Sequence, residues 1–334
     1  MKIESIAIIG AGAWGTALAT VALRAGRKVT IWAYEPETAR AINSHHENTA
    51  FLPGIPLDES IHATHDLHRA ADADAVFLAT PAQHLRATTQ ALAPALPPRT
   101  PAIICAKGIE SRSGCLMSEV VHEALPKAPL AVLAGPTFAA EVAREQPAAV
   151  TLACADAETG EALISVLGTR HFRPYLSKDV TACEIGGAVK NVLAVASGIV
   201  IGRGMGENAR AALVTRGMAE MVRLGTAKGA QAVSMMGLSG FGDLLLTCTS
   251  AQSRNMSLGI QLGEGGALED ILGHLNTVAE GVFTAAPVVS LARRIGVEMP
   301  ICEAVDQVLN HGADINKTIA GLLNRPFTNE AGNP

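Results

Sequence analysis

The feature that most constrains the fold is a glycine-rich turn near the N-terminus, Gly10-Ala11-Gly12-Ala13-Trp14-Gly15. An apolar run from Ile3 to Ile9 leads directly into this turn, and a stretch with helical character follows it. In this setting Gly10 allows a tight turn, Gly12 lets the backbone approach a pyrophosphate, and Gly15 lets the helix pack close to the strand. The N–H groups and dipole of the helix N-terminus favour an anion. The segment therefore predicts a dinucleotide-binding unit.

Short apolar or β-branched runs alternate with longer helical stretches through the first half of the chain. The runs expected to form strands are Ile3–Ile9, Val29–Trp32, Ala75–Ala79, Ala102–Ala106, Leu130–Ala134 and Val150–Cys154, with Phe172–Leu176 as a further edge strand. Continuous apolar strands separated by helices indicate a parallel sheet covered on both faces. We therefore expect an α/β fold whose N-terminal part is a Rossmann-type, doubly wound, mostly parallel sheet.

The pattern changes in the second half of the chain. From about Thr181 to about Asn324 the apolar residues follow helical spacing, which predicts a C-terminal all-helical domain. A chain of 334 residues is long enough for two domains. We expect a dinucleotide-binding domain over residues 1–180, a helical substrate domain over 181–326 and a tail over 327–334. Within the helical part, Gly259 to Gly266 is expected to be a loop.

Composition narrows the range of partners. The net charge is −5 and Lys and Arg are scattered, which argues against nucleic-acid or anionic-membrane binding. The longest apolar stretch, Val192–Gly202, is shorter than the roughly 20 residues of a bilayer span, so no membrane anchor is expected. Six dispersed cysteines fit reduced thiols and a cytoplasmic protein, and the histidines form no metal-binding pair. We expect no metal.

The end of the second expected strand bears on the choice of cofactor. Glu35 stands where an acidic residue commonly accepts hydrogen bonds from the ribose hydroxyls of NAD. Tyr34 intervenes, and no arginine stands beside it to hold a 2′-phosphate. Both NAD and NADP therefore remain candidates.

Five motifs together carry a resemblance to a known family. They are Gly10–Gly15, Ala106–Glu110, Gly135–Glu141, Gly186–Asn191 and Gln252–Asn255. In this order the chain resembles the bacterial-type NAD(P)-dependent glycerol-3-phosphate dehydrogenase family, from Ile6 to about Leu323. The resemblance implies reversible hydride transfer between NAD(P)H and C2 of dihydroxyacetone phosphate. The product, sn-glycerol 3-phosphate, would supply phospholipid synthesis.

By this resemblance Lys190 is the catalytic residue. Hydride addition to a ketone leaves an alkoxide that must gain a proton, and oxidation of the alcohol requires the reverse. Lys190 lies in an almost wholly apolar helical stretch, where a lysine is unfavourable unless it is used or paired. Nearby cations are expected to lower its pKa toward the working range.

The resemblance also implies the remaining site residues. The substrate-binding set is Lys107, Gly135, Thr137, Lys190, Asp243, Ser253, Arg254 and Asn255. The cofactor-binding set is Gly10, Gly12, Ala13, Trp14, Gly15, Tyr34, Lys107, Ala139, Arg254, Val278 and Glu280. Independently of the family, Lys107 and Gly135 follow expected strands, and ligands of open α/β sheets bind at the carboxyl ends of strands. Ser253, Arg254 and Asn255 offer a compact set of donors for a phosphate.

Two other functions remain as alternatives. A 6-phosphogluconate or β-hydroxyacid-type dehydrogenase shares a Rossmann half, a helical half and a lysine in a similar glycine-containing helix. The segments Ser253-Arg254-Asn255 and Gly135-Pro136-Thr137-Phe138 fit the glycerol-phosphate family better. A nicotinamide-sensing module without catalysis would lack the proton donor or the phosphate-binding residues. The sequence leaves the oligomeric state open, with a homodimer as one alternative.

Overall fold

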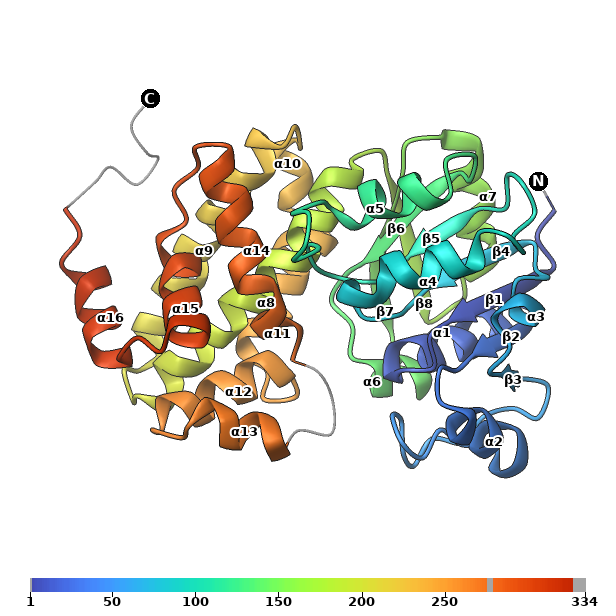
Figure 1. Ribbon diagram of the computed structural model, residues 1–334, viewed down its shortest axis with the longest axis horizontal. Helices are drawn as coiled ribbons and strands as arrows, with labels where there is room; N and C mark the ends of the chain where they lie inside the picture. The colour runs from blue at the N-terminus through green and yellow to red at the C-terminus, as the bar shows by residue number, and fades with distance from the viewer. Residues whose placement is uncertain (1, 275–278, 327–334) are drawn as a thin grey trace.

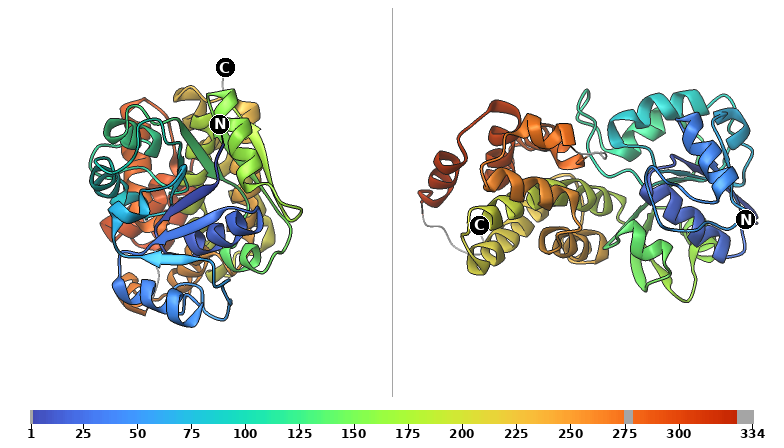
Figure 2. Two further views of the ribbon diagram at one scale, coloured as in Figure 1. Left: turned by 90° about the vertical axis from the view of Figure 1, so that its right-hand side faces the viewer. Right: turned by 90° about the horizontal axis from the view of Figure 1, so that it is seen from below.

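Two lobes lie side by side in the computed structural model, which describes residues 2–274 and 279–326 (Figure 1). The N-terminal lobe contains a sheet with helices, and the C-terminal lobe is helical. The lobes remain side by side when the molecule is seen from below (Figure 2). This arrangement confirms the expected fold class.

An eight-stranded sheet forms the centre of the N-terminal lobe. Its strands are β1 Ser5–Ile9, β2 Lys28–Trp32, β3 His62–Thr64, β4 Ala75–Leu78, β5 Ala102–Ile104, β6 Leu130–Ala134, β7 Ala148–Cys154 and β8 Phe172–Ser177. The spatial order is β3-β2-β1-β4-β5-β6-β7-β8. The order reverses at β1, between β2 and β4, so the carboxyl end of β1 is the switch point at which such sheets bind ligands.

The sheet departs from the sequence prediction at two places. The edge strand β3 was not predicted, because its three residues include two polar ones and form no apolar run. The pair β6–β7 is antiparallel, with Leu133 opposite Leu152, whereas every other neighbouring pair is parallel. A buried apolar run does not reveal strand direction, so the sequence pattern could not indicate this reversal.

Helices cover both faces of the sheet because successive side chains of a buried strand point to opposite faces. In β1, Ile6 and Ile8 join the core on one face, and Ala7 and Ile9 join the core on the other. The first core includes residues from α1 Ala13–Arg24, α2 Pro36–His45, α6 Ala139–Ala143 and α7 Ala157–Leu167. The second includes residues from α3 Leu67–Ala70, α4 Leu85–Leu92 and α5 Met117–Ala124, and η1 Ala82–His84 precedes α4.

The helical lobe is built around one long central helix, α8 Val180–Gly202. The other elements are α9 Glu207–Ala227, α10 Ala232–Met235, the π-helical segment η2 Leu238–Gly242, α11 Asp243–Thr249, α12 Arg254–Gly263, α13 Leu268–His274, α14 Glu280–Arg294, α15 Pro300–His311 and α16 Ile315–Leu323. Helices α9, α11, α12, α14 and α15 pack directly against α8. Side chains of α8 therefore form the middle of this lobe's core.

Glycines bring α8 and α12 into close contact. A Cβ atom on Gly198 would lie 2.1 Å from the carbonyl oxygen of Met256, and one on Gly259 would lie 2.1 Å from that of Val195. The expectation of a loop over Gly259 to Gly266 was therefore wrong through Gly263, where α12 ends. These glycines serve helix packing rather than a turn, and they fix the start of α12 relative to α8.

The length of α8 also corrects the sequence analysis. The apolar stretch Val192–Gly202 is only the second half of a helix of 23 residues. By length and composition, α8 and the segment Ala232–Thr249 could cross a membrane. Within the protein, 89% of the apolar window of α8 is buried, as expected for a core helix, against 39% for the second segment.

Candidate active site

Two lysines share one buried carboxylate where the lobes meet. Asp243 accepts a hydrogen bond from Lys190 Nζ at 2.6 Å through Oδ1, and one from Lys107 Nζ at 2.7 Å through Oδ2. The side chain of Asp243 is 1% exposed, that of Lys190 8% and that of Lys107 16%. Lys190 also donates to Thr247 Oγ1 at 3.0 Å. The structure thus brings three of the predicted site residues together.

Each of these three residues comes from a different part of the fold. Lys107 follows β5 at the carboxyl edge of the sheet, while Lys190 lies in the middle of α8. Asp243 is the first residue of α11, directly after η2. Short π-helical segments are frequent at functional sites because they redirect the residues that follow.

A glycine in α8 makes room for the segment that carries Asp243. A Cβ atom on Gly186 would lie 2.4 Å from the carbonyl oxygen of Ser239, so this glycine lets η2 approach α8. A Cβ atom on Gly187 would lie 3.4 Å from Cγ of Lys107, against which that side chain packs. Gly186 therefore lets the segment that leads into Asp243 lie beside Lys190, while Lys107 packs over Gly187 at an ordinary contact distance.

The charges in this cluster shift the pKa values of its members. Burial lowers the pKa of Lys190 to about 8, a shift that Asp243 opposes and Lys107 increases. Burial would raise the pKa of Asp243, but the two lysines outweigh this and hold it below its usual value. Lys190 can therefore exchange a proton near neutral pH while Asp243 stays ionised.

Gly135 and Thr137 lie at the neighbouring strand end, after β6. The carbonyl oxygen of Gly135 accepts hydrogen bonds from Lys107 Nζ at 3.5 Å and from Thr137 Oγ1 at 3.2 Å. A Cβ atom on Gly135 would lie 2.8 Å from Cα of Val150, so the residue also allows β6 to lie close to β7. These two predicted substrate residues thus border the lysine–carboxylate cluster.

The N-terminus of α12 presents the predicted phosphate-binding residues. Ser253 is the N-cap, and its Oγ accepts from Met256 N at 3.3 Å, while its hydroxyl donates to no group among the described residues. Asn255 donates to Asn191 Oδ1 at 3.0 Å and accepts from Gly281 N at 2.9 Å. Its second amide hydrogen has no acceptor among the residues that the structure describes. A phosphate here would also meet the first N–H groups of the helix.

Arg254 adds a positive charge to this helix end, opposite Glu280 of α14. The Arg254 side chain reaches solvent, yet its partly desolvated surroundings lower its pKa, an effect that Glu280 opposes. Burial raises the pKa of Glu280 to about 7, while Arg254 and the backbone of Ala82 counteract the shift. Ala82 belongs to the N-terminal lobe, so Glu280 lies where the two lobes meet.

The glycine-rich turn has the geometry that a dinucleotide pyrophosphate requires. Gly10 has φ +122°, and a Cβ atom there would lie 2.8 Å from the carbonyl carbon of Ala79. A Cβ atom on Gly15 would lie 2.0 Å from the carbonyl oxygen of Gly10, whereas one on Gly12 would meet open space. Helix α1 begins without a side-chain cap or an acidic residue in its first turn. Its N-terminal N–H groups therefore fit an anion.

The other predicted cofactor residues lie in different surroundings. Ala13, Trp14 and Ala139 pack against the same core of the N-terminal lobe, and Trp14 Nε1 is buried without a hydrogen-bond partner among the described residues. Tyr34 is 78% exposed after β2, and its ring meets that of Trp32 edge-on. Val278 lies outside the described residues.

Two residues that sequence reasoning did not select complete the site. Thr247 accepts from Lys190 and donates to the carbonyl oxygen of Asp243 at 2.6 Å, one helical turn before it. Asn191 was quoted in the α8 motif but not chosen, and it joins α8 to Asn255. The signal for Thr247 was its position four residues after Asp243, which places both on one helix face. Within residues 2–274 and 279–326, no group of His, Cys, Asp or Glu forms a metal site.

Comparison with known proteins decides the family. The N-terminal family model of NAD-dependent glycerol-3-phosphate dehydrogenase matches residues 5–160, and the C-terminal one matches residues 179–320. A protein of Rhodospirillum rubrum named glycerol-3-phosphate dehydrogenase (NAD(P)+) is 58% identical over 331 residues, which cover 99% of this chain and 95% of that protein.

The chain belongs to the NAD-dependent glycerol-3-phosphate dehydrogenase family. A Caulobacter vibrioides dehydrogenase of the same name is 54% identical, with 99% of this chain and 100% of that protein covered. The crystal structure of glycerol-3-phosphate dehydrogenase from Coxiella burnetii has a TM-score of 0.94 at 36% identity, and covers 97% of this chain and 99% of that one. Family membership decides against the 6-phosphogluconate and β-hydroxyacid type.

Proposed function

We propose that this member of the glycerol-3-phosphate dehydrogenase family interconverts dihydroxyacetone phosphate and sn-glycerol 3-phosphate, with Lys190 as the proton donor and acceptor. The observation that carries the proposal is the burial of Lys190 against Asp243, beside a second cation, Lys107. An unused lysine would be unfavourable in such a place. The proposal covers both NAD and NADP, in line with the names of the relatives.

The proton step follows from the state of Lys190. The nicotinamide of a bound cofactor supplies or accepts the hydride. In reduction, the ammonium group of Lys190 donates a proton to the oxygen on C2 of the substrate, and in oxidation the neutral amine removes it. A pKa of about 8 makes both forms of Lys190 accessible near neutral pH.

Lys107 and Asp243 keep Lys190 ready for this step. Asp243 holds the Nζ atoms of both lysines through its two oxygens, which fixes their separation. Lys107 repels the charged form of Lys190 and keeps its pKa low. In the proposal, Lys107 also binds the substrate, together with Gly135 and Thr137 at the end of β6.

The phosphate of the substrate is proposed to bind at the N-terminus of α12. The hydroxyl of Ser253, the guanidinium of Arg254 and the amide of Asn255 belong to three consecutive residues at this helix end, and each can donate a hydrogen bond to a phosphate. The link from Asn255 to Asn191 ties this helix end to the residue after Lys190. Phosphate binding energy can therefore position C2 against Lys190.

Discrimination between phosphorylated and unphosphorylated substrate tests the proposal. We expect rapid oxidation of NADH or NADPH, followed at 340 nm, with dihydroxyacetone phosphate, and nearly none with dihydroxyacetone. Arg254→Lys should lower kcat/KM for the phosphorylated substrate by about 10- to 100-fold, because lysine keeps the charge but loses the two-pronged donor geometry. Equal kcat/KM for both substrates in the wild-type enzyme would refute the phosphate assignment.

The proposal extends to the domains, the compartment and the cofactor contacts. Residues 181–326 would form the substrate domain, and Val278 and Glu280 would contact the cofactor from it. A cytoplasmic location is supported by the six cysteines, all of which are free. Under this proposal the product serves phospholipid synthesis.

A further inference from the structure

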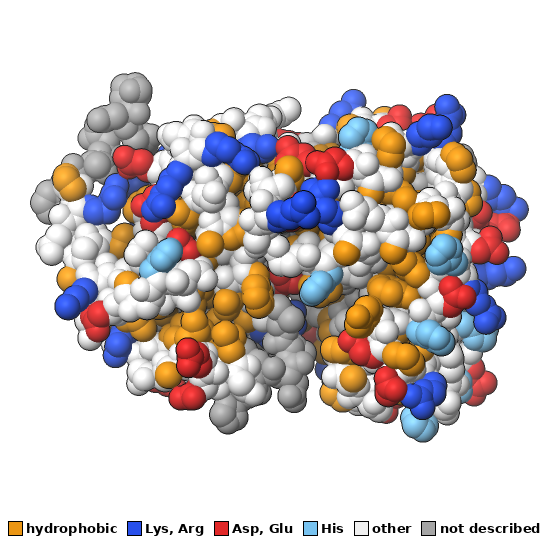
Figure 3. Space-filling model, in the orientation of Figure 1, with side chains coloured by type: hydrophobic (Ala, Val, Ile, Leu, Met, Phe, Trp, Pro, Cys, Tyr) orange, Lys and Arg blue, Asp and Glu red, His pale blue; other side chains and the backbone are white. Residues whose placement is uncertain are grey.

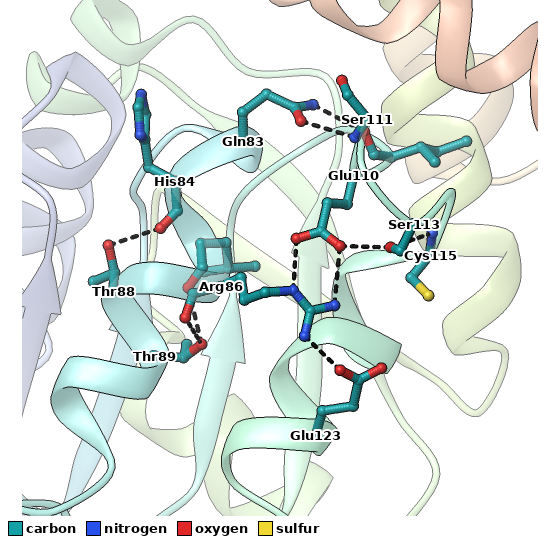
Figure 4. Close-up of polar contacts among 12 residues, drawn as sticks. Gln83, His84, Arg86, Thr88, Thr89, Glu110, Ser111, Ser113, Cys115 and Glu123 are labelled. Carbon is teal, nitrogen blue, oxygen red and sulfur yellow. Dashed lines mark hydrogen bonds and ion pairs between the residues drawn. The ribbon is translucent and has the colours of Figure 1, made fainter.

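An ion-pair network lies just beyond the loop that carries Lys107. Arg86 of α4 forms a two-pronged pair with Glu110, from Nε to Oε1 at 2.8 Å and from Nη2 to Oε2 at 2.9 Å. The third guanidinium nitrogen, Nη1, binds Glu123 of α5. Ser113 Oγ donates to the same carboxylate of Glu110, so that Arg86 lies between the two glutamates (Figure 4).

This network holds a short hairpin that begins two residues after Lys107. Ile109 pairs with Leu116, and Glu110 N donates to the carbonyl oxygen of Cys115 at 3.0 Å. Gln83 makes two backbone contacts at the hairpin's start, donating to Ile109 O and accepting from Ser111 N, each at 2.9 Å (Figure 4). We call residues 109–116 the Glu110 hairpin.

Gly108 leaves the backbone between Lys107 and Glu110 little room. A Cβ atom on Gly108 would lie 2.7 Å from Cβ of Ala82, in the same η1 segment that carries Gln83. With Gly108 packed against Ala82 and Glu110 held by Arg86, the Lys107 backbone is fixed on both sides, since β5 precedes it. A displacement of Glu110 would therefore be transmitted to Lys107.

The helical lobe holds the other side of the Glu110 hairpin. Arg294 donates to the carbonyl oxygens of Ser113 and Gly114, each at 3.2 Å, and Ser111 Oγ donates to that of Phe283 at 3.4 Å. Arg294 and Phe283 both belong to α14. On the molecular surface, charged side chains of both signs gather where the lobes meet (Figure 3). The hairpin therefore joins α4 of one lobe to α14 of the other.

We propose that Arg86 is a positioning residue that, through Glu110, sets the place of Lys107 against Asp243 and Lys190. The proposal rests on the proposed function, in which Lys107 binds the substrate. The Arg86 and Glu110 side chains are 19% and 7% exposed, so the pair has little freedom to rearrange. Buried ion pairs add little net stability over apolar packing, but their two-pronged geometry fixes orientation. Arg86 hydrogen bonds also hold the pKa of Glu110 below its usual value.

Steady-state kinetics on Arg86→Met, alone and combined with Lys107→Ala, test the proposal. We expect Arg86→Met to lower kcat/KM for dihydroxyacetone phosphate by about 10- to 100-fold, the effect of a small misplacement of a site group. In the Lys107→Ala background the same change should have almost no further effect, because its target is gone. Arg86→Lys should have a kcat/KM between those of Arg86→Met and wild type, since lysine keeps the positive charge but lacks the two-pronged donor geometry of arginine.

Two controls separate positioning from stability. Arg27→Met removes a partly buried arginine that binds the carbonyl oxygens of Ile3 and Ser165, and should leave kcat/KM unchanged well below its melting temperature. In Arg86→Met the buried carboxylate of Glu110 loses its partner, and adding Glu110→Gln removes that unpaired charge. The melting temperature of the double variant should therefore rise above that of Arg86→Met, while its kcat/KM stays low.

Three results would overturn the inference. The first is an unchanged kcat/KM in Arg86→Met. The second is that Arg86→Met lowers kcat/KM equally in the wild-type and the Lys107→Ala backgrounds. The third is that melting temperature and kcat/KM recover together in the Arg86→Met, Glu110→Gln double variant. Wild-type enzyme without activity on dihydroxyacetone phosphate would instead refute the proposed function, so the two failures are distinguishable.

Discussion

Lys190→Ala is expected to lower kcat by about 10²- to 10⁴-fold, the usual contribution of a positioned acid or base. Cofactor affinity should change little, because the glycine-rich turn lies in the other lobe. The fold should survive, although Lys107 and Thr247 would then be the partners that Asp243 keeps among the described residues. Rates at 340 nm, together with cofactor titration by fluorescence, measure both effects.

A matched lysine serves as the control for this variant. Lys228 is also in the helical lobe and pairs with Glu119 at 3.0 Å, with 22% of its side chain exposed. Lys228→Ala should keep the wild-type kcat. A wild-type kcat in Lys190→Ala would mean that another group supplies the proton.

Asp243→Asn should impair both stability and catalysis. The change leaves the buried Lys190 without a counter-charge, and breaking a buried ion pair in this way typically costs about 3–5 kcal/mol of unfolding free energy. The pKa of Lys190 should fall below its value of about 8, because Asp243 is the group that raises it. With Lys190 no longer held in place, kcat/KM should fall by at least about 100-fold.

The pH dependence of this loss has a definite sign. Below pH 8 the variant must either bury a charged Lys190 without a counter-charge or fold with Lys190 deprotonated, and both cost unfolding free energy. The variant should therefore be least stable relative to wild type near pH 6. Near pH 9 Lys190 is mostly neutral in both proteins and the difference should shrink. Melting curves at the two pH values measure it, with Asp74→Asn as a control carboxylate outside the site. A stability difference that grew with pH would contradict this account.

The glycine-rich turn and the apolar strands were predictable because their signals are local. A strand–turn–helix sequence identifies the turn, and runs of apolar and β-branched residues identify six of the eight strands. The segment of β8 was expected as a further edge strand. Strand β3 was missed because its sequence is short and polar. Gly259 was assigned to a loop because nothing in the local sequence reveals how close α8 lies: a Cβ atom on Gly259 would be 2.1 Å from the carbonyl oxygen of Val195. Such contacts depend on the tertiary packing.

In the candidate site, too, local signals were predictable and tertiary contacts were not. Lys190 was predictable as a site residue because a lysine in an apolar helix requires a partner. Local sequence alone did not identify that partner, because Asp243 lies 53 residues from Lys190 and 136 from Lys107 along the chain. Asp243 was predicted as a site residue only through the family resemblance. The link between Arg86 and Glu110 likewise joins helix α4 to a hairpin, and the sequences of these two segments carry no shared pattern. The resemblance supplied the residues, and the fold supplied their mutual geometry.

The central claim, that Lys190 moves the proton, is tested most directly by the pH dependence of kcat/KM in both directions. The neutral amine is the active form in oxidation of glycerol 3-phosphate, so that rate should rise with pH through about 8. The ammonium is the active form in reduction of dihydroxyacetone phosphate, so that rate should fall with pH over the same interval. Opposite limbs with a common midpoint near pH 8 are the predicted result, and limbs of the same sign, or none between pH 7 and about 9, would contradict it.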